Sequence, residues 1–334
     1  MVVSEDLSLF KVSNFKQWFR KMKRRIKCQI FSLNISNVQK CIGCSFVLVM
    51  VVIYFLNYEL FRTRFGREDI NDWRLDHLAK ACKRRNNGGH NNLQPAFYLH
   101  SKNHSLLYCL VFKAATSSWF YNFNSWAGFT DYEIMHIDNL FLARKFYPKE
   151  NRVTLMNSME HSFSFLVVRH PFERLISAFE DRLVSMKNAY YSRMSRAIYN
   201  RYHPNEGGKI SFRDFVQFII DDVEYNNTTL ALDIHWCPIN NLCTPCLARY
   251  DMIVKMETYT QDVQTLIKAA RLEGVVRMTH VNHVRSESVD SLAMKYFSQL
   301  TQGQLDKLYS IYEIDFELFG YSADKYFNIP KSPV

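Results

Sequence analysis

The stretch FSFLVVRHPFERLISAFEDRL, residues 163–183, decides the fold. Its first six residues, 163–168, are apolar apart from Ser164, which predicts a buried β-strand. Arg169 ends this apolar run, and Pro171 opens a segment with helical spacing. An arginine between a strand and a helix indicates a bound anion, because arginine and helix N-termini both attract negative charge. A surface ion pair of Arg169 is the alternative explanation.

Two further segments repeat the order of an apolar strand followed by a helix. Residues 106–112 lead into KAATSSWFYNF, and residues 252–256 lead into TYTQDVQTLIKAARL. Apolar strands that alternate with helices predict an α/β fold in three layers, with a mostly parallel sheet and helices on both faces. Ligands of such sheets bind where strands end and helices begin. The loops after residues 112 and 168 are therefore the expected site.

The first of these loops, in VFKAATSSWF at residues 111–120, contains one lysine, small residues and three hydroxyls. Small side chains let the backbone approach a phosphate, and Lys113 supplies a mobile positive charge. The loop is not a Walker A motif, because the glycines and the G-K-[ST] sequence are missing. A serine-rich helix cap beside a surface lysine is the alternative. In the second loop Arg169 and Ser177 recur at helical spacing, so together the loops predict a nucleotide phosphorylated at two places.

The two loops resemble the two phosphosulfate-binding motifs of the Golgi carbohydrate sulfotransferases. The resemblance is to the branch of chondroitin 4-O-, dermatan 4-O-, N-acetylgalactosamine 4-O- and HNK-1 sulfotransferases. Its first motif, Y-C-Y-x-P-K-V-A-C-T-N-W, corresponds to YCLVFKAATSSW, and its second, F-V-R-[DE]-P-F-x-R-L-x-S-A, to VVRHPFERLISA. Phe112 replaces the family's proline and His170 replaces an acidic residue. Similar motifs at 235–258 and 291–321 extend the resemblance over about residues 70–325.

The resemblance implies a P-loop-like sulfotransferase fold that binds 3′-phosphoadenosine-5′-phosphosulfate. The sulfuryl group would pass to a glycan hydroxyl, of the chondroitin/dermatan N-acetylgalactosamine 4-O type or a related type. Lys113 would meet the charge on the leaving oxygen, and Arg169 and Ser177 would hold the 3′-phosphate. No metal is required, because lysine and backbone amides can meet the leaving nucleotide. The residues expected to bind the donor are Phe112, Lys113, Ala114, Ala115, Thr116, Ser117, Ser118, Arg169, His170, Pro171, Phe172, Glu173, Arg174, Leu175, Ile176 and Ser177.

A sugar hydroxyl also needs a general base, and histidine suits that role near neutral pH. His136 and His235 are the catalytic candidates beside the lysine, and His136 is preferred because it matches a family histidine that precedes a helix. A structural role is the alternative for each histidine. With Cys237, Cys243 and Cys246, His235 also resembles a zinc cluster. A disulfide explains these cysteines more simply in an oxidising compartment.

A membrane anchor is expected near the N-terminus. Residues 41–58, CIGCSFVLVMVVIYFLNY, contain no charged residue, whereas residues 1–40 contain nine Lys/Arg and two Asp/Glu. A helix of that length spans ~27 Å, and the basic flank puts the N-terminus in the cytosol. A buried core helix and a cleaved signal peptide are the alternatives. The expected order is a cytosolic basic tail at 1–40, a transmembrane signal-anchor at 41–58, a lumenal stem at 59–95 and a catalytic domain at 96–334.

This organisation predicts a single-pass type II protein of the Golgi membrane with a lumenal catalytic domain. Apolar residues at 75, 78, 79 and 82 predict a helix in the stem that packs on the domain. The odd number of lumenal cysteines, five, leaves a thiol unpaired or bonded to another chain, so an oligomer remains open. Sequons predict glycosylation at Asn103, Asn226 and Asn227.

The expected partner is a glycan or proteoglycan acceptor. Nucleic acid is not expected, because most of the net charge of +10 lies in the N-terminal tail and the main domain is nearly neutral. A nucleotide kinase on a similar fold would need the missing Walker A motif. The alternative function is a catalytically inactive, glycan-binding membrane protein on a sulfotransferase scaffold, but such a protein would not need Lys113, Arg169 and Ser177.

Overall fold

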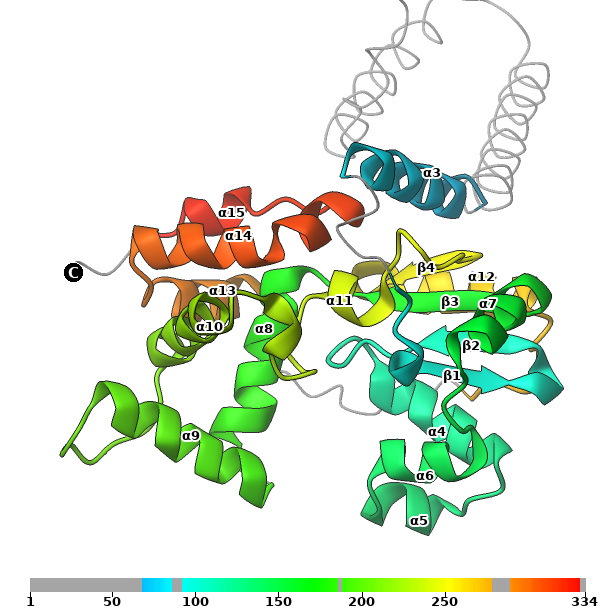
Figure 1. The fold of residues 1–334 in the computed structure, drawn as a ribbon, viewed down its shortest axis with the longest axis horizontal. Helices are drawn as coiled ribbons and strands as arrows, with labels where there is room; N and C mark the ends of the chain where they lie inside the picture. The colour runs from blue at the N-terminus through cyan, green and yellow to red at the C-terminus, as the bar shows by residue number, and fades with distance from the viewer. Residues whose placement is uncertain (1–67, 86–91, 186–187, 278–288, 331–334) are drawn as a thin grey trace, which may run out of the picture. The chain divides into compact units, whose positions relative to one another are not determined.

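The computed structural model of the protein, drawn in Figure 1, describes residues 68–85, 92–185, 188–277 and 289–330. All of these residues belong to one unit, 67–334. The predicted basic tail at 1–40 and the predicted anchor at 41–58 lie outside the described residues. Within the described ranges, no helix has the length and apolar character needed to cross a membrane.

A mixed sheet of four strands lies at the centre of this unit (Figure 1). The parallel strands β2, β3 and β4 are neighbours, with Tyr108 beside Phe165 and Val167 beside Val254. Strand β1 pairs antiparallel with β2 and forms one edge. The strands are β1 (Tyr98–Ser101), β2 (Leu106–Cys109), β3 (Phe163–Val168) and β4 (Met252–Lys255). The predicted α/β fold with a mostly parallel sheet is therefore confirmed, with β1 as an additional strand.

The predicted strand bounds agree best where burial is most continuous. Strand β3 has the predicted bounds, and all its side chains after Phe163 are buried. The segment predicted as a strand at 106–112 leaves β2 after Cys109, because the backbone turns at Val111, whose carbonyl accepts the N–H of Ala114. Residues 110–112 stay buried although they are no longer in the strand. The prediction for β4 is one residue too long.

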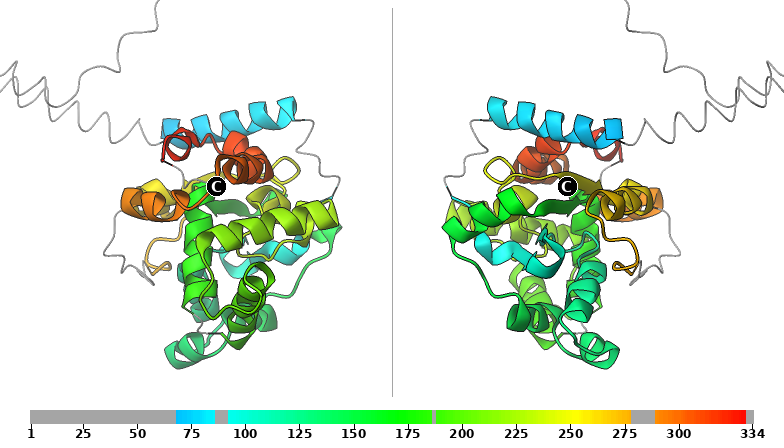
Figure 2. Two further views of the ribbon diagram at one scale, coloured as in Figure 1. Left: turned by 90° about the vertical axis from the view of Figure 1, so that its left-hand side faces the viewer. Right: turned by 90° about the vertical axis from the view of Figure 1, so that its right-hand side faces the viewer.

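Helices fill the connections between the parallel strands. Figures 1 and 2 show α3 (Glu68–Arg84) beside the edge strand β4, where Asn71 and Arg74 bond to the backbone of Ile253. Helix α4 (Thr116–Trp126) follows β2, and the predicted cover of helices on both faces of the sheet stays a prediction. After α4, the β2–β3 connection contains α5 (Asp131–His136), α6 (Asn139–Phe146) and α7 (Arg152–His161). The β3–β4 connection contains α8 (Pro171–Ala178), a π-helix (Phe179–Val184), α9 (Ala189–Tyr202), α10 (Phe212–Asn226) and α11 (Ile239–Cys243).

The chain after β4 forms α12 (Tyr259–Ala269), α13 (Val289–Phe297), α14 (Gln302–Leu318) and α15 (Asp324–Phe327). Short 3-10 segments lie at Pro95–Phe97, Lys102–His104, Thr229–Ala231 and Met256–Thr258. Helix α14 carries the fully buried Asp315, which accepts the N–H groups of Ile239 and Asn240 at the start of α11. The C-terminal helices thus hold the segment that precedes β4.

Helix α3 confirms the helix predicted in the stem, and it packs against the globular unit. Leu78, from the predicted apolar stripe, is buried. Arg74 is buried as well, and its Nη1 donates to Ile253 O of β4 at 2.8 Å and to Asp262 Oδ2 of α12 at 2.6 Å. A buried, paired arginine of this kind is costly to separate from its partners. The ion pair therefore fixes α3 on the edge strand β4.

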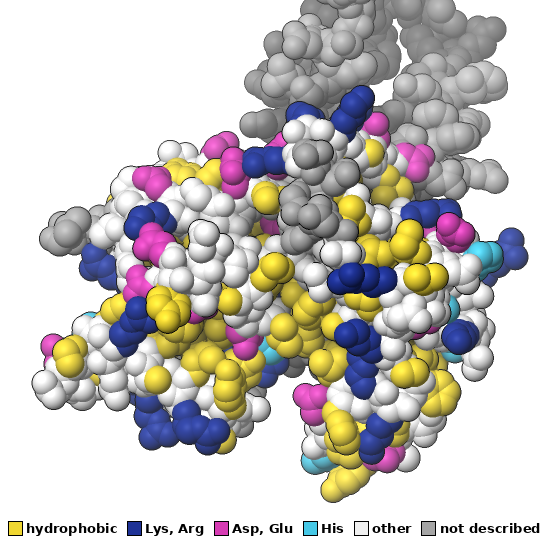
Figure 3. All heavy atoms as spheres, in the orientation of Figure 1, with side chains coloured by type: hydrophobic (Ala, Val, Ile, Leu, Met, Phe, Trp, Pro, Cys, Tyr) yellow, Lys and Arg dark blue, Asp and Glu magenta, His cyan; other side chains and the backbone are white. Residues whose placement is uncertain are grey.

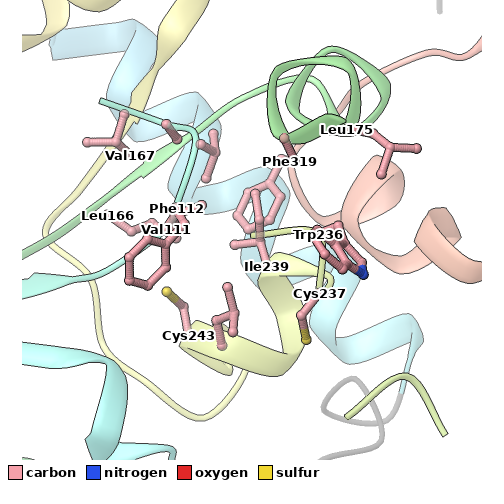
Figure 4. Packing of buried hydrophobic residues seen from close by; sticks show 14 of the residues in the cluster. Val111, Phe112, Leu166, Val167, Leu175, Trp236, Cys237, Ile239, Cys243 and Phe319 are labelled. Atoms are coloured by element: carbon pink, nitrogen blue, oxygen red, sulfur yellow. The ribbon is translucent and has the colours of Figure 1, made fainter. Parts of the chain in front are cut away.

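Four of the five cysteines after residue 59 form two disulfides, Cys82–Cys246 and Cys109–Cys243. The fifth, Cys237, is a buried free thiol, so one cysteine is unpaired as predicted. Figure 4 shows Cys243 and Cys237 within the core, near Trp236 and Ile239. In the described ranges no cluster of His, Cys, Asp and Glu has the arrangement of a metal site. The cysteines that resembled a zinc cluster in the sequence are thus divided between two disulfides and a thiol.

Candidate active site

The loops after β2 and β3 meet at the carboxyl end of the sheet, because these strands are parallel neighbours. Arg169 Nη1 donates to the backbone oxygen of Lys113 at 3.5 Å. Arg174 Nε, one turn into α8, donates to the backbone oxygen of Phe112 at 2.9 Å. The second motif thus holds the backbone of the first, and the predicted proximity of the two motifs is present in the structure.

The first loop has an unusual backbone for residues with side chains. Lys113 (φ 70°) and Ala115 (φ 56°) are both in the left-handed region, which costs roughly 1–3 kcal/mol for each such residue. Thr116 Oγ1 closes the loop by donating to Val111 O at 2.5 Å. Ala115 is the N-cap of α4 and has no side-chain oxygen, so the alternative of a serine-rich cap does not apply. In the first turn of α4, the N–H of Ser118 bonds to Ala115 O at 3.1 Å.

The side chain of Lys113, which belongs to this loop, lies at the centre of a charged cluster with Asp181 and Arg182. Its Nζ donates to Asp181 Oδ2 at 2.7 Å, and its side chain is only 17% exposed. Arg182 Nε lies 3.4 Å from the same carboxylate oxygen. Burial lowers the pKa of Lys113, the neighbouring Arg182 and Arg169 lower it further, and Asp181 opposes them. Burial alone would raise the pKa of Asp181, but the bond and charge of Lys113, together with the charge of Arg182, lower this pKa overall, so Asp181 is ionised.

His235 belongs to the same cluster. Its ring packs on Phe112, with 4.9 Å between ring centroids, and burial lowers its pKa. Nδ1 lies 2.7 Å from Asp233 Oδ1 and 2.9 Å from Tyr191 Oη. A carboxylate can only accept, so Nδ1 carries the proton and donates to Asp233. Nε2 is then an acceptor, and it is buried without a hydrogen-bond partner in the described part of the chain.

His136 lies elsewhere, at the C-terminal end of α5, and is exposed. Its Nδ1 contacts Tyr132 O at 2.8 Å, and its ring stacks on that tyrosine with 4.2 Å between centroids. These contacts are local to α5. The structure therefore brings His235, rather than the preferred candidate His136, into contact with the lysine loop.

The side chains of the second motif differ in burial. Arg169 is 15% exposed, with Nε 3.9 Å from Glu173 Oε2, whereas Ser177, in the second turn of α8, is buried. The side chain of His170 is buried and its Nε2 contacts Ser322 O at 2.9 Å. Its N–H donates to Glu257 Oε1 at 3.0 Å, so a carboxylate already lies at the N-terminus of α8. An anion here would depend on Arg169 more than on backbone N–H groups.

The remaining residues of the second motif form the support of the loop. Arg174 is 1% exposed and also reaches Ile234 O at 3.4 Å, which ties the motif to the segment of His235. The other buried side chains of the motif belong to the core, and they are Pro171, Phe172, Leu175 and Ile176. Ala114 is buried in the first loop, Thr116 and Ser118 are buried at the start of α4, and Ser117 is exposed. Apart from Ser117, these side chains are packed inside the two loops and support their shape.

Four residues of the cluster were not predicted from the sequence, namely Asp181, Arg182, Tyr191 and Asp233. One signal was available: Arg169, Glu173 and Ser177 recur every four residues, and the same spacing leads to Asp181. Arg182 packs over the ring of Tyr191 at 5.2 Å, and Tyr191 Oη donates to Asp233 Oδ2 at 3.0 Å. The cluster thus runs without interruption from Lys113 to His235.

The surface is hollowed beside these elements. Figure 3 shows a hollow between the part formed by α9 and the part formed by α5 and α6, with hydrophobic side chains on its walls. Tyr191 links α9, one wall of this hollow, to His235. Two further cavities, of about 170 and 430 Å³, lie away from the cluster, beside Arg74 and beside Glu150. We take the charged cluster as the candidate active site because the loops of both motifs meet there.

The fold and the two loops define an α/β protein with the loop arrangement of nucleotide-binding, group-transfer proteins. The chain belongs to the sulfotransferase family, whose model matches residues 96–322. It is 30% identical over 242 residues to carbohydrate sulfotransferase 8 of Homo sapiens, and the aligned region covers 67% of this chain and 55% of that protein. Identity to carbohydrate sulfotransferase 11 of Rattus norvegicus is 26% over 246 residues, 68% of each chain.

A third relative, carbohydrate sulfotransferase 10 of Xenopus laevis, is 33% identical over 170 residues, 48% of this chain and 47% of that protein. The chain thus spans only a little more than half the length of the first of these relatives. No solved structure matches the chain. The resemblance to carbohydrate sulfotransferases inferred from the two motifs is confirmed by these matches.

Proposed function

We propose that the protein transfers the sulfuryl group of 3′-phosphoadenosine-5′-phosphosulfate to a hydroxyl group of a glycan. The observation that carries this proposal is the contact between the two motifs. Arg169 Nη1 lies 3.5 Å from the backbone oxygen of Lys113, and the charge of Arg169 acts on the ammonium group of Lys113, so two cations from successive strand–helix units lie near each other. A donor with two separate phosphate groups needs such a pair, and the partly buried setting strengthens each charge.

The residues of the site fit this donor. Lys113 is a mobile charge on a loop of small residues, suited to the bridge between sulfate and 5′-phosphate. Arg169 offers a planar fork that can bind a 3′-phosphate with two hydrogen bonds. The family match supports this donor as co-substrate. No residue of the described cluster is assigned to a metal.

The acceptor hydroxyl would lose its proton to Nε2 of His235. The hydroxyl oxygen forms a bond to sulfur while the bond between sulfur and the bridging oxygen breaks, and the electron pair stays on the 5′-phosphate. Lys113 meets this growing charge, and Asp233 stabilises the protonated imidazole through Nδ1. An unpartnered, buried Nε2 is the position that a hydroxyl donor would satisfy. His235 therefore replaces His136 as our preferred general base.

The acceptor and location form a finer part of the proposal. We infer a glycan or proteoglycan acceptor of the chondroitin/dermatan type or a related type, in the Golgi lumen, with residues 41–58 as a type II anchor. Two observations support a lumenal domain: two disulfides are formed, and Asn103, Asn226 and Asn227 are all exposed for glycosylation. Disulfides of this kind are typical of oxidising compartments.

The test is transfer of radiolabelled sulfate from the donor to a panel of desulfated glycans by the full chain. We expect incorporation into at least one glycan, and loss of incorporation in Lys113→Ala. Lys145→Ala is the matched control, because Lys145 is an exposed lysine of α6 that packs over Phe141. Glycan binding without any transfer by the parent would contradict the proposal and favour an inactive glycan-binding protein.

A further inference from the structure

Asp181 owes its position to an irregular helix. Helix α8 ends at Ala178 and continues as a π-helix over Phe179–Val184, in which Ser185 N–H donates to Glu180 O, five residues earlier, at 2.9 Å. Such π segments add a residue to a turn, and they frequently occur at functional sites. Here the segment presents Asp181 to Lys113, whereas its neighbour Glu180 accepts from Tyr296.

The charges around Lys113 are unequal in sign. The cation Arg182 comes from the π-helix and the cation Arg169 from the end of β3, and the neutral His235 lies in the segment before α11. Asp181 is the acidic group that accepts a hydrogen bond from Lys113 Nζ, and its bond and charge oppose the loss of the lysine's proton. A lysine in a buried, cation-rich place tends to lose its proton, and a carboxylate at 2.7 Å opposes that loss.

In the free protein, Asp181 also accepts a hydrogen bond from Nζ of Lys113, the group that would bind the anion. The carboxylate is 39% exposed, so it lies at the edge of the cluster where an anion can displace it. A sulfate or phosphate oxygen near Lys113 would compete with Asp181 and would be repelled by it. The same side chain thus helps the lysine to stay charged and weakens the binding of the anion.

We propose that Asp181 is a positioning residue that keeps Lys113 charged and in place until the donor takes over its ammonium group. This inference rests on the proposed function, since the donor is the competing anion. It predicts two opposite effects for Asp181→Asn. Below the pKa of Lys113, nucleotide binding becomes stronger because the repulsion is gone. Above it, binding and turnover fail at a lower pH than in the parent, because Lys113 has lost its carboxylate.

The experiment measures the affinity of the full chain for adenosine 3′,5′-bisphosphate by calorimetry between pH 6 and pH 10, together with sulfate transfer. In Asp181→Asn we expect about twofold to fivefold tighter binding near pH 6.5, the size of a half-exposed charge effect. We expect the alkaline loss of binding to move down by about one pH unit or more. Asp181→Glu should restore the alkaline limb, and Glu180→Gln is the matched control from the same π-helix.

A parallel loss at every pH would mean that Asp181 only supports the fold, and an unchanged pH profile would mean that it does not act on Lys113. Either result overturns the role of Asp181 while leaving the proposed function intact. If the folded parent bound no bisphosphate and transferred no sulfate, the proposed function and this inference would both fall. Thermal unfolding of each variant separates these cases from misfolding.

Discussion

Replacement of Arg169 by lysine tests whether this residue binds the 3′-phosphate of the nucleotide. The change keeps the positive charge but removes the planar fork that can hold a phosphate with two hydrogen bonds. In the free protein Arg169 makes a long bond to Lys113 O at 3.5 Å and a distant ion pair with Glu173 at 3.9 Å. Because the positive charge is kept, we expect the unfolding free energy to change less than it does on replacement of a fully buried arginine.

The expected loss appears in donor binding. A hydrogen bond to a charged group contributes about 1.5–3 kcal/mol, so the dissociation constant should rise about 10- to 150-fold. The assay is calorimetric titration with 3′-phosphoadenosine-5′-phosphosulfate and, in parallel, with the analogue that lacks the 3′-phosphate. Parent and Arg169→Lys should bind the analogue almost equally, because the group that Arg169 contacts is absent.

Arg174→Lys is the matched control, since the two arginines stand in one motif but differ in burial. Arg174 is 1% exposed and holds Phe112 O and Ile234 O. Its replacement should lower the unfolding free energy by about 2–4 kcal/mol and weaken both nucleotides by the same factor. If Arg169→Lys behaved in this way too, Arg169 would support the fold, and its assignment to the 3′-phosphate would be wrong.

Four further outcomes are expected. Lys113→Ala should lower kcat about 100- to 1,000-fold with little change in thermal unfolding, because its charge acts mainly on the leaving oxygen; a folded variant with undiminished turnover would exclude this role. Burial lowers the pKa of His235, so the acid limb of kcat/KM should lie below about pH 6.5, since the base must be neutral and activity falls as pH drops through this pKa. His235→Asn should abolish turnover and His136→Asn should not; the reverse result would restore His136 as the base. Loss of the buried Cys109–Cys243 disulfide in a double alanine variant should cost about 2–5 kcal/mol in denaturant unfolding, and an unchanged midpoint would contradict the importance of this link.

Continuous burial made much of the fold predictable. Five of the six residues of β3 are apolar, as expected for a strand that is covered on both faces, and the prediction had the observed bounds. Strand β1 was missed, since four residues with one half-buried position, YLHS, carry no periodic signal. The disulfide pairs could not be predicted, because they join segments 134 and 164 residues apart and depend on the tertiary fold.

The candidate site was predictable where charge interrupts an apolar pattern. Arg169 and Lys113 stand directly after strand segments, so the sequence indicated both. Spacing could not show that Arg174 faces the interior, or that the chain after α8 continues as a π-helix over Phe179–Val184, which includes Asp181. The preference for His136 was based on similarity to a family position, whereas the contact of His235 with Phe112 depends on the path of the chain before α11.

The disulfide of α3 has a mechanical consequence for a chain that is held by its N-terminal end. A pull on α3 would pass through Cys82 into Cys246, and three residues away Cys243 is bonded to Cys109 at the end of β2. Two covalent links thus carry the load from the helix into the central strands. Tension applied at α3 would therefore reach β2 without passing along the chain between Cys82 and Cys109.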